Sequence, residues 1–222
     1  MKRLNNKRAF EFFIPILIIT LTFFYACVSA NQTMPYAEGW YTYYAKLINS
    51  GHKVYKDFDY LFTPFYIYFI AFFTKIFGYK IIALRILGAI LFSGISITLY
   101  FTLKEIFPKW IAGISTIIAV FYMQSEIVQI YYDYVRFMDF FVLLSALLFL
   151  KAMKCEEQRK IKYLYLFLSG VSTACILLIK QNTGGVSFVF FVLFSVVFSL
   201  CIRKKFVIFI RELSAYIIGF LI

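Results

Sequence analysis

The chain has 222 residues, of which 63% are hydrophobic and 22% aromatic, and its mean hydropathy is +0.82. A soluble domain does not need this much apolar surface, so the composition predicts an all-α, polytopic transmembrane helical bundle of about six or seven spans. The net charge of +12 lies in short runs between apolar segments. Such runs are typical of cytoplasmic loops facing anionic lipid, so we expect membrane lipids and no nucleic acid as partners.

The first predicted element is a membrane span over 10–30. A basic segment, 1–8, precedes it, the apolar run is long for the core of a signal peptide, and no convincing cleavage site follows. We therefore expect an uncleaved helix whose N-terminus is cytoplasmic. The chain would then be an integral multi-pass protein, with the cell (plasma) membrane as its expected location.

The segment that follows, 31–79, is predicted to be an outer catalytic loop with juxtamembrane helices. Trp40 and Tyr44 stand at helical spacing in an aromatic-rich stretch, which favours a helix lying on the membrane surface. Gly51 is well placed to end this helix. Glu38 falls in its first turn, where the helix dipole favours an ionised carboxylate.

The apolar stretch 60–78, which carries Pro64 near its start, decides the topology. If it lies along or dips into the outer face, 15 of the 23 lysines and arginines fall on the cytoplasmic side, whereas only 9 do so if it spans. Because basic residues concentrate on the cytoplasmic side, we predict an outer juxtamembrane or re-entrant helix here.

The rest of the chain, 80–222, is predicted to hold the further spans of a single membrane domain. The expected helices cover 80–104, 110–128, 137–154, 163–180 and 185–202. Their outward connections are roughly 124–138 and the turn 180–185. The ten residues that follow Glu212 are about half a span, so we expect 1–222 to be the N-terminal part of a longer protein or a natural short form.

Acidic residues are rare, and on this map several converge on the outer face. They are Glu38, Asp57, Asp59, Glu126, Asp133 and Asp139. Ionisable groups near the membrane are functional candidates. For Glu38 a catalytic role stands against a simple helix-start charge. Asp139 opens a strongly apolar helix, and its alternative role is that of an N-cap.

Two basic residues lie at the outer ends of predicted helices, Arg85 and Lys180. Both could reach lipid headgroups by snorkelling. Alternatively they bind a lipid-linked phosphate, for which arginine offers paired donors and lysine a point charge. The tyrosines and tryptophan of 36–68 are typical of a membrane interface, although aromatic faces also suit sugar rings.

The order and spacing of these residues resemble a family. The matching positions are Glu38, Tyr41, Ala45, Lys46, Ile48, Gly51, Tyr55, Asp57, Phe58, Pro64, Ile76, Phe77, Gly78, Arg85, Tyr132, Asp133, Tyr134, Asp139, Lys180 and Gln181. Together they are similar to the GT-C glycosyltransferases, in the branch that holds protein O-mannosyltransferases and the lipid A aminoarabinose transferase. The family's usual acidic pair is Ala37-Glu38 here, its Pro-Pro is Thr63-Pro64, and its members are about twice as long.

The resemblance implies a polyprenyl-phosphate sugar donor and a glycan, lipid or protein acceptor. It implies that Glu38 acts on the acceptor hydroxyl, and that Asp139 or Asp133 assists or binds a divalent cation. Metal dependence stays open, and no cofactor is certain. We expect Arg85 and Lys180 to bind the donor phosphate.

The same hypothesis assigns a substrate cleft to four residues of the outer loops, namely Trp40, Tyr41, Asp57 and Tyr132. A flippase or transporter for lipid-linked sugars is the rival interpretation. Transporters more often show repeats and acids at mid-bilayer, which this sequence lacks. A non-catalytic, truncated remnant is a third alternative.

Overall fold

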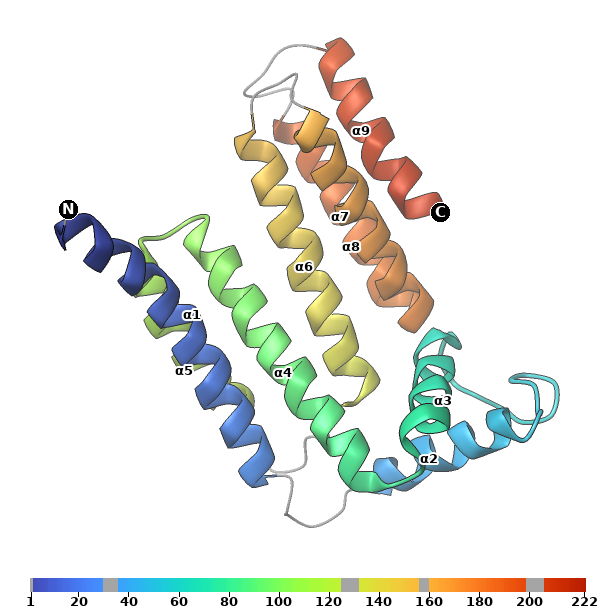
Figure 1. Ribbon diagram of the computed structural model, residues 1–222. Coiled ribbons are helices and arrows are strands. Elements are labelled where there is room, and N and C mark those ends of the chain that lie inside the picture. The colour runs from blue at the N-terminus through green and yellow to red at the C-terminus, as the bar shows by residue number, and fades with distance from the viewer. Residues whose placement is uncertain (1, 30–35, 125–131, 156–159, 199–205) are drawn as a thin grey trace. The chain divides into compact units, whose positions relative to one another are not determined.

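The computed structural model describes residues 2–29, 36–124, 132–155, 160–198 and 206–222, and within these ranges the chain is helical and has no strand (Figure 1). The helices described are α1 (Lys2–Ser29), α2 (Tyr36–Asn49), α3 (Phe65–Phe77), α4 (Ile81–Lys104), α5 (Lys109–Gln124), α6 (Tyr134–Lys154), α7 (Lys160–Ile179), α8 (Gln181–Phe198) and α9 (Phe206–Leu221). The predicted all-α class is therefore confirmed.

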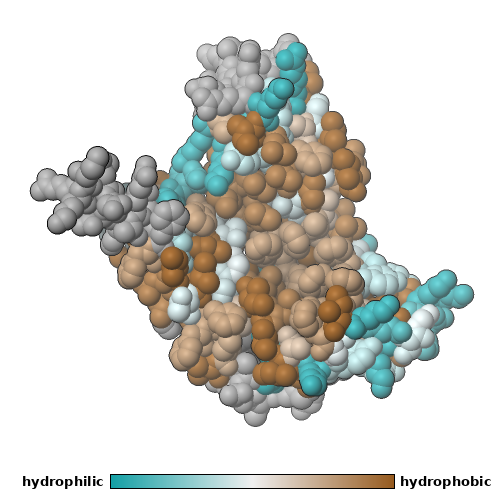
Figure 2. All heavy atoms as spheres, viewed as in Figure 1, coloured by the Kyte–Doolittle hydropathy of each residue, from teal (hydrophilic) through white to brown (hydrophobic). Residues whose placement is uncertain are grey.

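Two of the described helices, α4 and α7, are both long and apolar enough to cross a bilayer. Shorter apolar helical stretches cover Phe13–Val28, Phe65–Phe77, Lys109–Val120 and Gln181–Val197. Large hydrophobic side chains are exposed along many of the helices, and Figure 2 shows them as wide brown areas between smaller hydrophilic ones. Exposed apolar surface of this extent is typical of contact with lipid.

Several predicted boundaries hold, whereas the predicted starts of α6 and α8 are wrong. Helix α2 ends where Gly51 adopts a left-handed φ of 93°, as the sequence suggested. Residues 180–185 were expected to form a turn, but α8 already begins at Gln181. Gly184 explains the difference, because a side chain at this position would clash with the backbone of Leu177. The glycine lets α8 start one residue after α7 ends, so it permits close helix packing rather than a turn.

The chain forms two compact units. The first comprises Met1–Lys53 and Ile67–Phe140, and the second comprises Val54–Tyr66 and Phe141–Ile222. In the first unit α1, α4 and α5 pack along one another, with buried clusters of Ile18, Tyr100 and Ala112 and of Ala26, Ala89, Phe92 and Val120. Helix α2 is attached to α3 through the Asn49 amide, which donates to the Ala71 carbonyl over 2.9 Å.

In the second unit α7 packs against α8 and α9 around Phe149, Leu166, Phe191 and Tyr216. Hydroxyl groups bridge helices in its interior: Ser145 of α6 lies 2.9 Å from the hydroxyls of both Ser169 and Thr173 on α7, and Tyr216 of α9 donates to Thr173. Lys162 of α7 forms a buried ion pair with Glu212 of α9. These polar pairs join α6, α7 and α9 by satisfying groups that have no access to water.

Gly170 and Gly219 set the approach of α7 to α9. A Cβ on Gly170 would clash with the Tyr216 carbonyl, and one on Gly219 would clash with the Phe167 carbonyl.

We predict that Gly170→Val lowers the free energy of unfolding by about 3 kcal/mol, because backbone atoms cannot move aside as flexible side chains do. Thermal unfolding in detergent checks this. Gly185→Ala is the control, because Gly185 has no neighbour within 4 Å and should lose little stability.

Candidate functional site

The first unit contains a buried ion pair between α2 and α4. Glu38, in the first turn of α2, is only 3% exposed. Arg85 of α4 donates to both of its oxygens, from Nε to Oε1 over 3.1 Å and from Nη2 to Oε2 over 2.8 Å. A buried carboxylate needs such a partner, and the paired donors of arginine also fix its orientation. The sequence predicted where Glu38 lies on its helix, but not that Arg85 is its partner.

A second acid lies close by through Tyr41, which follows Glu38 by one turn of α2. The Tyr41 hydroxyl donates to Oδ1 of Asp133 over 2.5 Å. Tyr132 is also buried, and its ring packs edge-on against that of Tyr41, with a centroid distance of 6.4 Å. The structure therefore gathers Glu38, Tyr41, Arg85, Tyr132 and Asp133, which we call the Glu38 cluster.

Tyr132 and Asp133 have shifted proton affinities in this cluster. Burial raises the pKa of the Tyr132 phenol well above its usual value, and the neighbouring Glu38 carboxylate raises it further. Tyr132 therefore stays protonated. Burial also raises the pKa of Asp133, while hydrogen bonds from Tyr41 and from the backbone N–H groups of Tyr134 and Val135 oppose this rise.

Asp133 occupies the cap of α6. It directly precedes the first helical residue, Tyr134, and its carboxylate accepts bonds from the first backbone N–H groups. The capping role that the sequence suggested as an alternative for Asp139 was therefore wrong, because α6 begins at Tyr134 and not at 137. Asp139 lies in the second turn and pairs with Arg136 over 3.2 Å. Arg136 is buried, and no pattern in the sequence singled it out.

Tyr41→Phe tests the link between the two acids. The hydrogen bond from Tyr41 lowers the pKa of Asp133, so its loss raises that pKa further. If the protein's activity requires the ionised Asp133, the acid side of the pH–activity profile moves to higher pH in this variant. We also expect a loss of about 1 kcal/mol in the free energy of unfolding. Rate measurements across pH check this shift, with the exposed-residue variant Tyr43→Phe as the control. An acid side at the same pH in Tyr41→Phe as in the wild type would contradict the prediction.

The described residues do not assemble a typical metal site. No group of three or more His, Cys, Asp or Glu side chains comes together among them. Asp133 accepts from Tyr41, and Asp139 pairs with Arg136, so each of the two proposed ligands is engaged with a protein donor. Among the described residues, these side chains therefore do not form a ready-made cation site.

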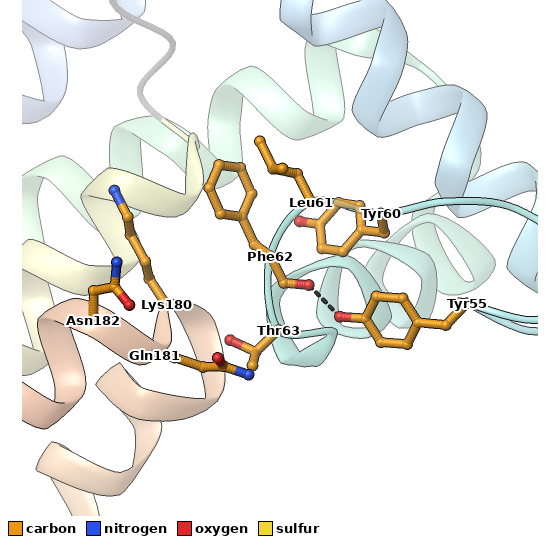
Figure 3. Close-up of a pocket in the computed structure, with 8 residues that line it drawn as sticks. All are labelled: Tyr55, Tyr60, Leu61, Phe62, Thr63, Lys180, Gln181 and Asn182. Carbon is orange, nitrogen blue, oxygen red and sulfur yellow. Dashed lines mark hydrogen bonds between the residues drawn. The ribbon is translucent and has the colours of Figure 1, made fainter.

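The remaining predicted site residues lie outside this cluster. Trp40 is on α2 but is 64% exposed. Asp57 and Lys180 belong to the second unit, where Asp57 is exposed. Lys180 lines a cavity of about 370 Å³ (Figure 3). The cavity walls come from a loop, with Tyr55, Tyr60, Leu61, Phe62 and Thr63, from Lys180, and from the start of α8, with Gln181 and Asn182.

Comparison with known proteins decides the family. A family model described as dolichyl-phosphate-mannose-protein mannosyltransferase matches residues 62–222, well over half of the chain. The chain belongs to this family. No curated protein and no solved structure matches it.

Membership in the mannosyltransferase family confirms the resemblance to GT-C glycosyltransferases. It places the chain among membrane glycosyltransferases with a lipid-linked sugar donor, and so favours the enzyme over the transporter interpretation. The family match includes Arg85, Tyr132, Asp133, Asp139 and Lys180. The segment with Glu38 precedes the match, and Glu38 is joined to the matched part of the chain by its hydrogen bonds with Arg85.

Proposed function

We propose that the protein transfers a sugar from a polyprenyl-phosphate donor to an acceptor at the outer face of the membrane. The observation that carries this proposal is the Glu38 cluster. In it the buried Glu38, which precedes the matched residues 62–222, accepts two hydrogen bonds from Arg85, which lies within them. Buried, paired ionisable groups at a membrane protein's polar end are typical of a functional site.

The chemistry is the substitution of one oxygen for another at the anomeric carbon. The acceptor hydroxyl attacks this carbon, its proton passes to Glu38, and the bond from the carbon to the phosphate oxygen breaks. The lipid phosphate leaves with the bonding electron pair. Single displacement of this kind inverts the configuration at the anomeric carbon.

Other members of the cluster have supporting roles. Asp133 orients the acceptor, and Asp139 is an alternative for this task. The neutral Tyr132 and Tyr41 shape the cleft and donate hydrogen bonds. Arg85 holds Glu38 in place through its two hydrogen bonds to the carboxylate. Lys180 is proposed as a phosphate ligand because its positive charge lines the cavity of the second unit.

The proposed membrane arrangement follows the charge distribution. Helices α1 and α4–α8 would span the plasma membrane, with the N-terminus in the cytoplasm, and α2 and α3 would lie at the outer face. Helix α3 has 13 residues and is therefore about 20 Å long, shorter than a hydrocarbon core of about 30 Å. It is also shorter than each helix proposed to span, and the lysine and arginine count supports the juxtamembrane position.

The test uses the purified protein in sealed vesicles with farnesyl-phosphoryl-mannose labelled in the sugar, and with membrane and protein extracts as the acceptor source. We expect labelled sugar to become covalently attached to an acceptor while farnesyl phosphate is released. Movement of intact donor across the bilayer without release of farnesyl phosphate would instead indicate the transporter. Donor that is neither cleaved nor moved would indicate the non-catalytic alternative.

A further inference from the structure

The cavity of the second unit is built by a loop in a defined conformation. Tyr55 has a φ of 67°, a backbone region that residues with side chains seldom adopt. Its hydroxyl donates to the Phe62 carbonyl, and its backbone N–H donates to the Phe58 carbonyl over 3.0 Å. Uncommon backbone angles of this kind are retained where the surrounding contacts enforce them, often at binding sites.

A further contact attaches the same loop to the helices. The Thr63 hydroxyl donates to the Leu177 carbonyl in the last turns of α7, over 3.1 Å. Because α8 starts directly after Lys180, this bond fixes the loop beside the first residues of α8. The cavity is therefore formed entirely within the second unit, from two segments that the sequence analysis had both assigned to the outer side.

The side chains of the cavity combine three kinds of chemistry. Lys180 supplies a positive charge, and its Nζ lies 5.8 Å from the centre of the Phe62 ring. Gln181 and Asn182 supply side-chain amides, and Figure 3 shows Gln181 extending toward Thr63. Tyr60 supplies an aromatic face, packed edge-on against Phe62 with a centroid distance of 6.1 Å.

These groups match one class of ligand. A cation binds a phosphate, amides both donate to and accept from sugar hydroxyls, and aromatic rings pack against the C–H face of a sugar. A volume of about 370 Å³ lies within the usual range for small-molecule sites of about 300–1,000 Å³. An acyl or prenyl chain alone would call for an apolar lining without the two amides.

We propose that this cavity binds the phosphorylated sugar headgroup of a lipid-linked donor, with Lys180 on the phosphate and Gln181 and Asn182 selecting the sugar through its hydroxyls. The identity of the ligand rests on the proposed function, whereas the assignment of Gln181 and Asn182 as specificity-determining residues rests on the cavity.

The test is equilibrium binding to the full chain in nanodiscs of neutral lipid, with three probes: farnesyl-phosphoryl-mannose, farnesyl phosphate and phosphatidylglycerol. We expect Gln181→Ala and Asn182→Ala each to weaken binding of the mannosylated probe about tenfold and to change binding of farnesyl phosphate by less than about twofold. Lys180→Met should weaken both farnesyl probes about tenfold or more. Phosphatidylglycerol should compete poorly.

Lys75→Met is the matched control, because Lys75 is exposed at the end of α3 and should leave all affinities unchanged. If Gln181→Ala and Asn182→Ala weakened the binding of both farnesyl probes equally, or did not weaken it, the proposed contact of the two amides with the sugar would be overturned. Competition by phosphatidylglycerol as strong as by the mannosylated probe would mean that the cavity takes a bulk lipid headgroup. If the amide variants bind as wild type while labelled sugar is still transferred, this inference alone fails. If the wild type does not bind the mannosylated probe, the proposed function fails with it.

Discussion

Replacement of Glu38 by glutamine is expected to reduce sugar transfer by about 10²–10⁴-fold, the usual contribution of a positioned general base. The amide keeps the size of the side chain and can still accept a hydrogen bond from Arg85, so the cluster should stay folded. It cannot take the proton of the acceptor hydroxyl. The measurement is the initial rate of farnesyl phosphate release, with thermal unfolding of the same preparation alongside.

Asp59→Asn provides the control for this variant. Asp59 is an exposed acid of the following loop and has no proposed role, so its rate should equal that of the wild type. A Glu38→Gln protein that is folded and transfers sugar at the wild-type rate would remove the general base from the mechanism. The family assignment, which rests on 62–222, would remain.

A large effect on stability is also expected for Arg85→Met. This change leaves the buried Glu38 carboxylate without its paired donors, and breaking such a pair typically costs about 3–5 kcal/mol. Arg85 is 18% exposed, and water can therefore replace part of the lost interaction, so we expect about 3 kcal/mol. Denaturant unfolding in detergent measures the loss, and Lys80→Met, an exposed residue just before α4, should show none.

The double variant Glu38→Gln with Arg85→Met separates stability from catalysis. Removal of the charge along with its partner should recover much of the lost stability, because no unpaired buried carboxylate remains. Activity should not return. Additive losses of stability in the double variant would show that the two side chains do not stabilise each other, contrary to the contacts in the structure.

The sequence predicted those features that depend on local periodicity. The all-helical class, the helix that holds Glu38 in its first turn and the glycine that ends it all follow from spacings within a few residues. The partners of the acids did not follow in this way. Arg85 is 47 residues from Glu38, and Asp133 is 92 residues from Tyr41, so neither contact leaves a signal in a local pattern.

Two local signals were available but were misread or missed. Glycines near 184 were interpreted as a turn, although the same residue type also permits close packing of helices, which is its role between α7 and α8. The spacing of three residues between Arg136 and Asp139 is that of a helical ion pair, and a helix start at Tyr134 would have revealed it.

The central claim is that both acids of the Glu38 cluster face the non-cytoplasmic side. It is tested most directly by labelling intact cells with a membrane-impermeant maleimide, after replacement of the native cysteines. The reporters are Tyr43→Cys on α2, Tyr122→Cys near the end of α5, and Phe107→Cys between α4 and α5, all at exposed positions. We predict that the first two are labelled in intact cells, and that Phe107→Cys is labelled only after permeabilisation. Labelling of Tyr43→Cys and Tyr122→Cys from opposite sides of the membrane would contradict the account.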